Sequence, residues 1–293
     1  SNIHVLKYFG MNDFPGVRLT LISSQRDTPY SGMLPGLVAN IYETDQLQLN
    51  LERLCQFADA RFIRAEVIGI DSSEKRIVLK DRPALGYDLL SLNVGAIPEV
   101  ELSGALPVKP ISVFLATLKY LDLNVRSGST LTIVGSGAAG VELSLSFSAR
   151  YSQRLKIKLI GNELLGGDDS SVSRKVQAEL CSKNINFSKN KVIGFSKGMI
   201  SLEDGSAAES DFVVQATGVV APTWISSSGL DVDKRGFLKV NHHLQSISNQ
   251  FIFAAGDVAC LEGQERPKSG VFAVRAGKVL ARNLFLALAN KKL

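Results

Sequence analysis

Short apolar runs rich in β-branched residues alternate along this chain with segments whose apolar residues recur every three or four positions. Residues 131–134 and 251–254 are such runs, and residues 3–9 show helical spacing. The same spacing predicts longer helices at about 170–182 and 272–289. Strands that alternate with helices are typical of α/β proteins. We therefore expect an α/β fold.

Two regions of the chain share one plan, which suggests two similar domains with one inserted in the other. In each region short strands, at residues 61–81 and 192–202, lie between strands of a Rossmann-like unit. Three prolines and weak periodicity mark residues 99–110 as a linker. The expected division assigns an outer domain, first part, to 1–105, an inserted domain to 106–240, and the rest of the outer domain to 241–293.

Length and composition fit an ordinary globular protein. With 293 residues the chain is long enough for about two domains. Its 45% hydrophobic and 21% charged residues exclude a disordered or collagenous chain. The net charge of +5 is scattered without a run of basic residues, so nucleic acid is not an expected partner. No uncharged apolar stretch reaches about 18 residues, so we expect no transmembrane segment.

The cysteines and histidines predict neither disulfides nor metal sites. Cys55, Cys181 and Cys260 lie far apart and form no CxxC pair and no metal-ligand spacing. His242 and His243 are adjacent rather than one helical turn apart, which is not a zinc-binding pattern. The first ten residues lack the pattern of a secretory signal. These features favour a cytoplasmic protein.

The strongest local motif is a glycine-rich turn that follows the apolar run at 131–134. Gly135, Gly137 and Gly140 form the pattern GxGxxG and precede a predicted helix. In a dinucleotide-binding fold the first glycine allows a tight turn, and the second lets a pyrophosphate approach the backbone. The third lets the helix pack close to the strand. The alternative is a turn that binds nothing, and the strand and helix on either side favour binding.

The acid that usually binds the ribose is missing from its expected place after the glycines. The next predicted strand ends at Gly161 and Asn162, and Glu163 follows two residues after Gly161. No arginine stands there for a 2′-phosphate either. NAD and NADP therefore remain open alternatives.

A Gly-Asp pair follows the apolar run at 251–254. Gly256 and Asp257 would lie just beyond the carboxyl end of a strand, where ligands bind in open α/β sheets. Aspartate is also a preferred helix N-cap, so the pair alone has two interpretations.

Four motifs in a fixed order resemble those of one flavoprotein family. They are Tyr-Asp with Gly-Ala-Ile-Pro in residues 87–98, the glycine loop with Glu142, Gln-Ala-Thr-Gly at 215–218, and Ala-Gly-Asp at 255–257. Spread over nearly the whole chain, they resemble the pyridine nucleotide-disulfide oxidoreductases, which have two dinucleotide-binding domains.

Residues 28–36 and 267–275 narrow the resemblance to the type II NADH dehydrogenase branch. Within it they are most similar to the NADH dehydrogenase-like domain fused to selenide, water dikinase. The resemblance implies two Rossmann-like domains, with an NAD(P)-binding domain (106–240) inserted in an FAD-binding domain (1–105 and 241–293). The first strand and glycine loop of the FAD domain would be missing. FAD and NAD(P)H are the implied cofactors.

The resemblance also implies individual roles. Asp257 would hydrogen-bond the flavin ribityl chain, Phe272 would face the isoalloxazine ring, and Glu142 would meet the nicotinamide. The alternatives are core packing for Phe272, a solvated helix face for Glu142 and a simple turn for Pro29 and Tyr30, which would lie where the chain crosses the flavin. The expected cofactor-binding residues are Pro29, Tyr30, Gly95, Gly135, Gly137, Gly140, Glu142, Gly218, Gly256, Asp257, Val258, Gly270, Val271 and Phe272.

The implied activity is that of an FAD-dependent NAD(P)H oxidoreductase that passes electrons to a quinone or another small acceptor, with a possible link to selenium metabolism. Residues 28–36 contain no cysteine, so we expect no redox-active disulfide. Because the cofactor would carry the chemistry, we assign no acid–base catalytic residue. The predicted strand at 17–22 is followed by Ser23 instead of the acid that would hold the FAD ribose. The alternative is a non-catalytic module that regulates or docks to a selenophosphate-synthesising partner.

Overall fold

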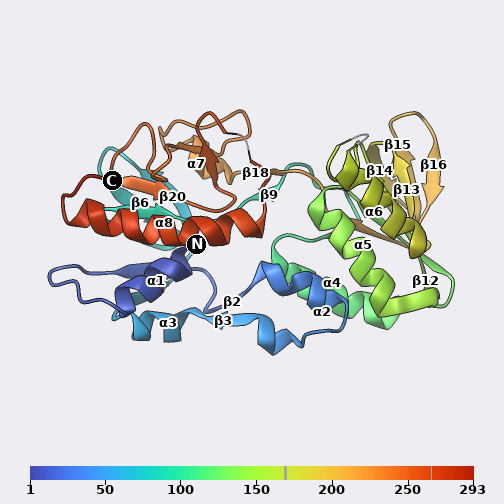
Figure 1. The fold of residues 1–293 in the computed structure, drawn as a ribbon, viewed down its shortest axis with the longest axis horizontal. Helices are drawn as coiled ribbons and strands as arrows, with labels where there is room; N and C mark the ends of the chain where they lie inside the picture. The colour runs from blue at the N-terminus through green and yellow to red at the C-terminus, as the bar shows by residue number, and fades with distance from the viewer. Residues whose placement is uncertain (168–169, 265) are drawn as a thin grey trace. The chain divides into compact units, whose positions relative to one another are not determined.

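The structure is a computed structural model, which describes residues 1–167, 170–264 and 266–293. Contacts between residues divide the chain into two compact units (Figure 1). Unit 1 comprises Ser1–Thr28, Leu49–Ile97 and Val219–Leu293, and unit 2 comprises Pro29–Gln48 and Pro98–Gly218.

Unit 2 is built on a five-stranded parallel sheet. Its strand order is β10-β17-β11-β12-β13, and β11 lies at the centre. Residues Leu131 to Val134 of β11 are buried, as expected for a central strand that is covered on both faces. The strands of this sheet are β10 (Leu106–Pro107), β11 (Ser129–Val134), β12 (Leu155–Gly161), β13 (Asn186–Lys189) and β17 (Phe212–Gln215).

Two different layers cover this sheet. Helices pack on one face, where Leu131 and Ile133 join Phe114 and Phe147 in the largest apolar cluster. A three-stranded antiparallel sheet packs on the other face, against Val134. The covering elements are α2 (Leu34–Val38), α4 (Ile111–Asn124) and α5 (Ala138–Tyr151), then β14 (Val192–Ser196), β15 (Met199–Leu202) and β16 (Ala207–Glu209); α6 (Ser171–Ser182) packs beside β13.

Unit 1 combines short parallel strand pairs with a three-stranded antiparallel sheet. The parallel pairs are β1-β4, β8-β20 and β19-β21, and the antiparallel order is β5-β6-β7. These strands are β1 (Thr20–Ser23), β4 (Arg61–Arg64), β5 (Val67–Asp71), β6 (Arg76–Leu79), β7 (Arg82–Gly86), β8 (Leu90–Leu92), β19 (Leu238–Val240), β20 (Ile252–Ala254) and β21 (Ala259–Leu261).

Helices α1 (Asn2–Gly10) and α8 (Gly270–Leu288) lie side by side in unit 1 (Figure 1). Val5 and Phe9 of α1 share an apolar cluster with Leu280 and Leu284 of α8 and with Phe253 of β20. The remaining elements are β2 (Asp27–Pro29), β3 (Gln48–Asn50), α3 (Leu51–Phe57), β9 (Ile97–Pro98), β18 (Val219–Val220), α7 (Thr223–Ser226) and three short 3₁₀ turns at 31–33, 44–47 and 152–154.

The structure confirms the mixed α/β fold, and a three-stranded antiparallel sheet occurs in each unit. The linker expectation for 99–110 was wrong in part, because Leu106 and Pro107 pair with β17. Proline is tolerated there because β10 is an edge strand. Helix α4 was not anticipated.

The boundaries of unit 2 fall after residues 97 and 218, and the unit also includes 29–48. The ranges expected from the sequence placed the boundaries after 105 and 240; which nucleotide each unit binds stays a prediction. In the described part of the chain, none of the helices is long and apolar enough to cross a membrane.

Candidate functional site

The glycine-rich loop joins β11 to α5, and two of its glycines are required by the fold itself. Gly135 has a φ of +112°, and a side chain there would overlap the Ala216 carbonyl group. Gly140 lies in the first turn of α5, where a side chain would overlap the Gly135 carbonyl oxygen. The first glycine permits the turn, and the last permits the close packing of helix on loop.

Gly137 differs from both of these glycines. It is the N-cap of α5, with φ −73° and ψ −171°, an extended conformation that any residue adopts. A Cβ atom added there would have no neighbour within 4 Å. The fold of unit 2 therefore gives no reason for glycine at this position, whereas the approach of a phosphate group to the backbone would.

The N-terminus of α5 opens beside Gly137. No side chain caps the helix, and its first internal bond runs from the Val141 N–H to the Gly137 carbonyl (3.0 Å). The first turn of a helix presents N–H groups without intrahelical acceptors, and the helix dipole adds positive potential. Such an end favours an anionic group such as a pyrophosphate.

Hydrogen bonds fix the loop to the end of β12. The Ser136 hydroxyl donates to the Glu163 carbonyl (2.5 Å), and the Leu165 N–H donates to the Ser136 carbonyl (2.9 Å). A side chain on Gly161 would collide with Ser136. The segment after β12 is thus hydrogen-bonded to the glycine loop. Glu163, the first acid of this segment, contributes its backbone carbonyl to these bonds.

A pocket of about 100 Å³ lies beside the Gly-Asp turn of unit 1. Its lining includes Gly256 and Asp257 from the turn after β20 and Phe272 from the first turn of α8. Val240 and Leu244 contribute apolar surface to it. Pockets for drug-sized ligands measure roughly 300–1,000 Å³. This pocket therefore encloses only a part of a flavin-sized group, with a carboxylate, apolar walls and an aromatic ring.

Lys268 lines the same pocket and is held in place. Its ammonium group donates to the Ala259 carbonyl (2.6 Å) and lies 3.8 Å from the centroid of the Phe237 ring. Burial lowers the pKa of Lys268, and nearby groups, among them Asp257, oppose that shift. The sequence marked Lys268 only as part of the 267–275 motif.

Three other expected positions in unit 1 differ in their surroundings. Val258 is fully buried and packs in the core, so its side chain does not line the pocket. Gly256 has a φ of +77°, and a side chain there would lie 2.6 Å from Asn93 Nδ2. Val271 is 57% exposed at the start of α8.

The expected residues divide evenly between the two units. Unit 1 holds Gly95, Gly256, Asp257, Val258, Gly270, Val271 and Phe272. Unit 2 holds Pro29, Tyr30, Gly135, Gly137, Gly140, Glu142 and Gly218. Within unit 2, Glu142 is exposed on α5, and Tyr30 is 40% exposed just before α2.

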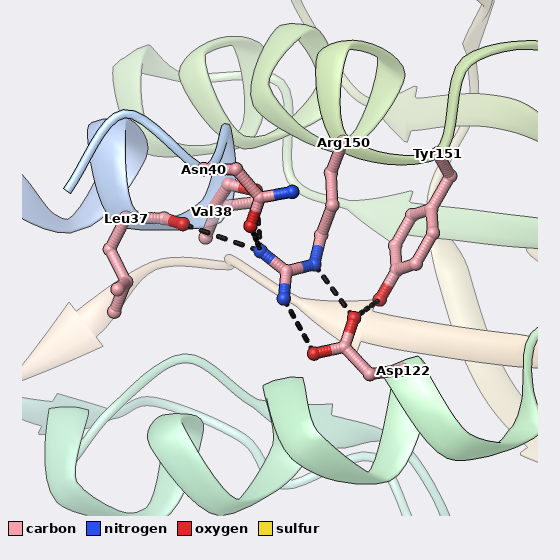
Figure 2. Close-up of polar contacts among 6 residues, drawn as sticks. All are labelled: Leu37, Val38, Asn40, Asp122, Arg150 and Tyr151. Atoms are coloured by element: carbon pink, nitrogen blue, oxygen red, sulfur yellow. Dashed lines mark hydrogen bonds and ion pairs between the residues drawn. The ribbon is translucent and has the colours of Figure 1, made fainter. Parts of the chain in front are cut away.

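Unit 2 also contains a polar cluster that the sequence analysis did not anticipate (Figure 2). The Arg150 guanidinium donates to both carboxylate oxygens of Asp122 (2.7 and 2.5 Å), and the Tyr151 hydroxyl donates to the same carboxylate (2.9 Å). Arg150 also donates to the carboxyl end of α2, where its acceptors are the carbonyl groups of Leu37 and Val38 and the side-chain oxygen of Asn40. The cluster fastens the segment 29–48 to α4 and α5.

The three cysteines in the described part of the chain differ in burial. Cys55, Cys181 and Cys260 form no disulfide. Cys55 is buried, and burial together with Glu52 raises the pKa of its thiol. In the described ranges no group of three or more His, Cys, Asp or Glu side chains is arranged to hold a metal ion.

Comparison with known proteins decides the family. Residues 7–277 match the model of the pyridine nucleotide-disulphide oxidoreductases. The chain therefore belongs to this family. It is 31% identical to an NADH oxidase of Methanocaldococcus jannaschii over 241 residues, which are 74% of this chain and 52% of that protein.

Two further relatives are similar to this chain over different shares of their length. Ferroptosis suppressor protein 1 of Taeniopygia guttata is 28% identical (81% of this chain, 66% of that protein), and a type II NADH:quinone oxidoreductase of Haemophilus influenzae is 30% identical (56% and 41%). The chain thus spans from two fifths to just under two thirds of these relatives.

A solved structure shares the fold. The water-forming NADH oxidase from Lactobacillus brevis, bound to NADH, superimposes with a TM-score of 0.81 at 18% identity. The match covers 96% of this chain and 66% of the oxidase. At this identity the match establishes the fold and no more.

Proposed function

We propose that this member of the family is an FAD-dependent NAD(P)H oxidoreductase that works without a redox-active disulfide. In this proposal unit 2 is the NAD(P)-binding domain, inserted in an FAD-binding domain formed by unit 1. The ranges proposed from the sequence, 106–240 for the former and 1–105 with 241–293 for the latter, differ from the bounds of the two units, which change after residues 97 and 218 and place 29–48 in unit 2. Relatives named as an NADH oxidase and an NADH:quinone oxidoreductase support this assignment.

The observation that carries the proposal is the contrast among the three loop glycines. Gly135 and Gly140 are glycine because a side chain would collide with the chain's own backbone. Gly137 has an ordinary backbone conformation and open space before it. The fold does not require glycine at position 137. At the N-terminus of a helix without a side-chain cap, a glycine allows a pyrophosphate to approach the backbone closely. These residues fit the nucleotide, and Glu142 would lie toward its nicotinamide end.

The pocket beside the Gly-Asp turn is the reason for assigning the flavin to unit 1. Asp257 would accept hydrogen bonds from the ribityl hydroxyls, and Gly270, Val271 and Phe272 would face the ring from the start of α8. The pocket's volume of about 100 Å³ suits a ribityl-sized portion of the cofactor. When bound, the flavin would supply the redox chemistry between NAD(P)H and an acceptor. The protein contributes binding and orientation.

The acceptor proposed is a quinone or another small molecule, because a relative is named an NADH:quinone oxidoreductase. The resemblance of residues 28–36 and 267–275 to the dikinase-associated domain keeps a selenium compound as a second acceptor. The absence of cysteine from 28–36, together with the high pKa of the buried Cys55 thiol, supports electron transfer without a thiol relay.

A specific observation also favours the non-catalytic alternative. β1 ends at Ser23 and β12 at Gly161, two positions where an acid would hold a ribose in this family. Loss of both acids would weaken nucleotide binding and is compatible with a module that only docks to a selenophosphate-synthesising partner.

An anaerobic titration separates the two functions. The 293-residue chain is saturated with FAD, and NADH and NADPH are added in separate experiments while the visible flavin band is recorded. Bleaching by either nucleotide is the expected result. Bound flavin that neither nucleotide bleaches would overturn the oxidoreductase and leave the docking module. The variant Gly137→Val serves as the control, because it should retain flavin and lose bleaching.

A further inference from the structure

The outer face formed by α1 and α8 carries a concentration of positive charge. Arg275, Lys278 and Arg282 follow one another at intervals of three and four residues, so they lie on one face of α8. All three are exposed, and so is Lys7 on α1. The two helices touch where a side chain on Gly277 would lie 2.7 Å from His4 Nδ1, next to Lys278.

No acid balances this charge on either helix. Residues 1–12 and 270–293 contain no aspartate or glutamate. Among the described residues, none of the four cations forms an ion pair or a side-chain hydrogen bond. Clustered like charges repel one another in the folded state, so a one-sign face is typical of surfaces that attract an oppositely charged partner.

Apolar side chains lie among the cations. Val271, Val274 and Val279 are 57%, 38% and 45% exposed on the same outer part of α8. Residues 271–282 span about 17 Å of helix at 1.5 Å per residue. A mixed surface of short apolar and long cationic side chains resembles a protein–protein interface, where an apolar centre is surrounded by polar groups.

We propose that this α1/α8 face is a docking surface for an acidic protein partner. The face borders the pocket beside the Gly-Asp turn, because Val271 directly precedes Phe272. A lipid surface is disfavoured, since helices that lie in membranes bury Trp, Phe or Leu side chains. In the described residues of α1 and α8 the exposed large apolar side chains are valines, with Met11 exposed just after α1. Single-stranded nucleic acid is disfavoured because the described residues of α1 and α8 include no exposed aromatic side chain for base stacking, although Phe57 of α3 is exposed beside Gly10.

The test uses a fluorescein-labelled, glutamate-rich peptide of about 20 residues as the acidic probe, with the full 293-residue chain. Fluorescence anisotropy measures binding at low and high salt; contacts between exposed charges weaken with ionic strength. The variant Arg275→Glu/Lys278→Glu/Arg282→Glu is expected to bind at least about tenfold more weakly, a change of roughly 1.4 kcal/mol. A variant with the same change in net charge on exposed cations of unit 2, Lys119→Glu/Lys156→Glu/Arg174→Glu, should bind within about twofold of wild type.

Equal losses in the two triple variants would overturn the proposal, because binding would then follow net charge alone. Absence of binding to the wild type at low salt would also overturn it. Stronger binding of phosphatidylserine vesicles or of a 20-nucleotide DNA strand than of the peptide would replace the acidic protein with a lipid or a nucleic acid. If the charge-reversed chain does not fold, Arg275→Gln/Lys278→Gln/Arg282→Gln is measured instead. Peptide binding needs no flavin reduction, so this result is independent of the proposed activity.

Discussion

Arg150 and Asp122 form a two-point ion pair between α5 and α4, with Nε and Nη2 of the guanidinium on the two carboxylate oxygens (2.7 and 2.5 Å). Arg150 is the more buried partner, with 14% of its side chain exposed against 37% for Asp122. The third guanidinium nitrogen donates to the Leu37 and Val38 carbonyls at the end of α2. One side chain thus ties three helices together, because it also donates to carbonyl groups in the last turn of α2, which have no N–H donor within the helix itself.

This pair predicts an acid-sensitive contribution to stability. Burial alone would raise the pKa of Asp122, but hydrogen bonds from Arg150 and Tyr151, with the charge of Arg150, hold it below its usual value. A carboxyl with a lowered folded-state pKa stabilises the fold above its unfolded pKa, near 4, and that contribution is lost as pH falls through the folded pKa. The free energy of unfolding should therefore fall between about pH 5 and pH 2.

Asp122→Asn should reduce the free energy of unfolding at neutral pH by about 1 kcal/mol, a value discounted for the partial exposure of the carboxylate. Its loss of stability below pH 5 should be shallower than that of wild type. Urea unfolding at pH 7 and at lower pH measures both. Glu179→Gln, which removes an exposed pair with Lys183 at 3.9 Å, is the control and should change little. Parallel pH curves for wild type and Asp122→Asn would contradict the linkage.

Thr132 predicts a stabilising substitution. It lies fully buried on the central strand β11, and its hydroxyl oxygen has no hydrogen-bond partner among the described residues. An unsatisfied buried hydroxyl costs free energy that a methyl group does not. Thr132→Val, which keeps the branched shape, should raise the free energy of unfolding by about 1 kcal/mol. Urea unfolding tests this, with Thr130→Val on the same strand as the control. A loss of stability would show that the hydroxyl is satisfied in solution.

Local features of the fold were predictable because their signals are local. The strand β11, the glycine loop and helix α5 follow directly from the apolar run and the spacing of Gly135, Gly137 and Gly140. Helix α4 also had a sequence signal, since Phe114, Leu118 and Leu121 recur at helical spacing after a proline. The cluster of prolines just before it, however, is typical of a linker and obscures this signal.

Long-range features were not predictable in the same way. Asp122 and Arg150 are 28 positions apart, and each alone is an ordinary charged residue on a helix. The grouping of 29–48 with unit 2 depends on contacts with α5 that leave no periodic trace in the sequence. Likewise, the hydrogen bond from Lys268 to the Ala259 carbonyl depends on a tertiary fold that spacing does not encode.

The cysteines predict a negative result for thiol chemistry. Cys55 is 1% exposed and packs against apolar neighbours, so the replacement there is alanine, which leaves no buried hydroxyl. Cys55→Ala/Cys181→Ser/Cys260→Ser should keep NAD(P)H-dependent dye reduction within about threefold of wild type, which is less than 1 kcal/mol in the barrier. Steady-state assays and a thermal melt of the triple variant check this. A loss beyond about 100-fold in a folded variant would reveal a thiol step.

The glycine loop gives the sharpest prediction, because substitutions at Gly140 and at Gly137 should have different effects. Gly140→Ala would force a collision with the Gly135 carbonyl, so it should lower the melting temperature and weaken NADH binding together. A Cβ atom at position 137 meets no protein atom within 4 Å and no unfavourable φ, so the melting temperature of Gly137→Val should stay close to that of wild type. Its branched side chain would nevertheless occupy the space where the pyrophosphate must contact backbone N–H groups.

Calorimetric titration with NADH should show at least about 100-fold weaker binding for Gly137→Val, which is roughly 2.7 kcal/mol. Gly194→Val is a matched control in the same unit, because Gly194 also has room for a side chain and lies in β14, away from the loop. It should bind NADH as wild type does. Since Gly137→Val is expected to keep the wild-type structure, its affinity for NADH reports directly on the loop. A normal affinity would contradict the proposal. It would mean that the loop is only a turn and that the nucleotide, if bound, lies elsewhere.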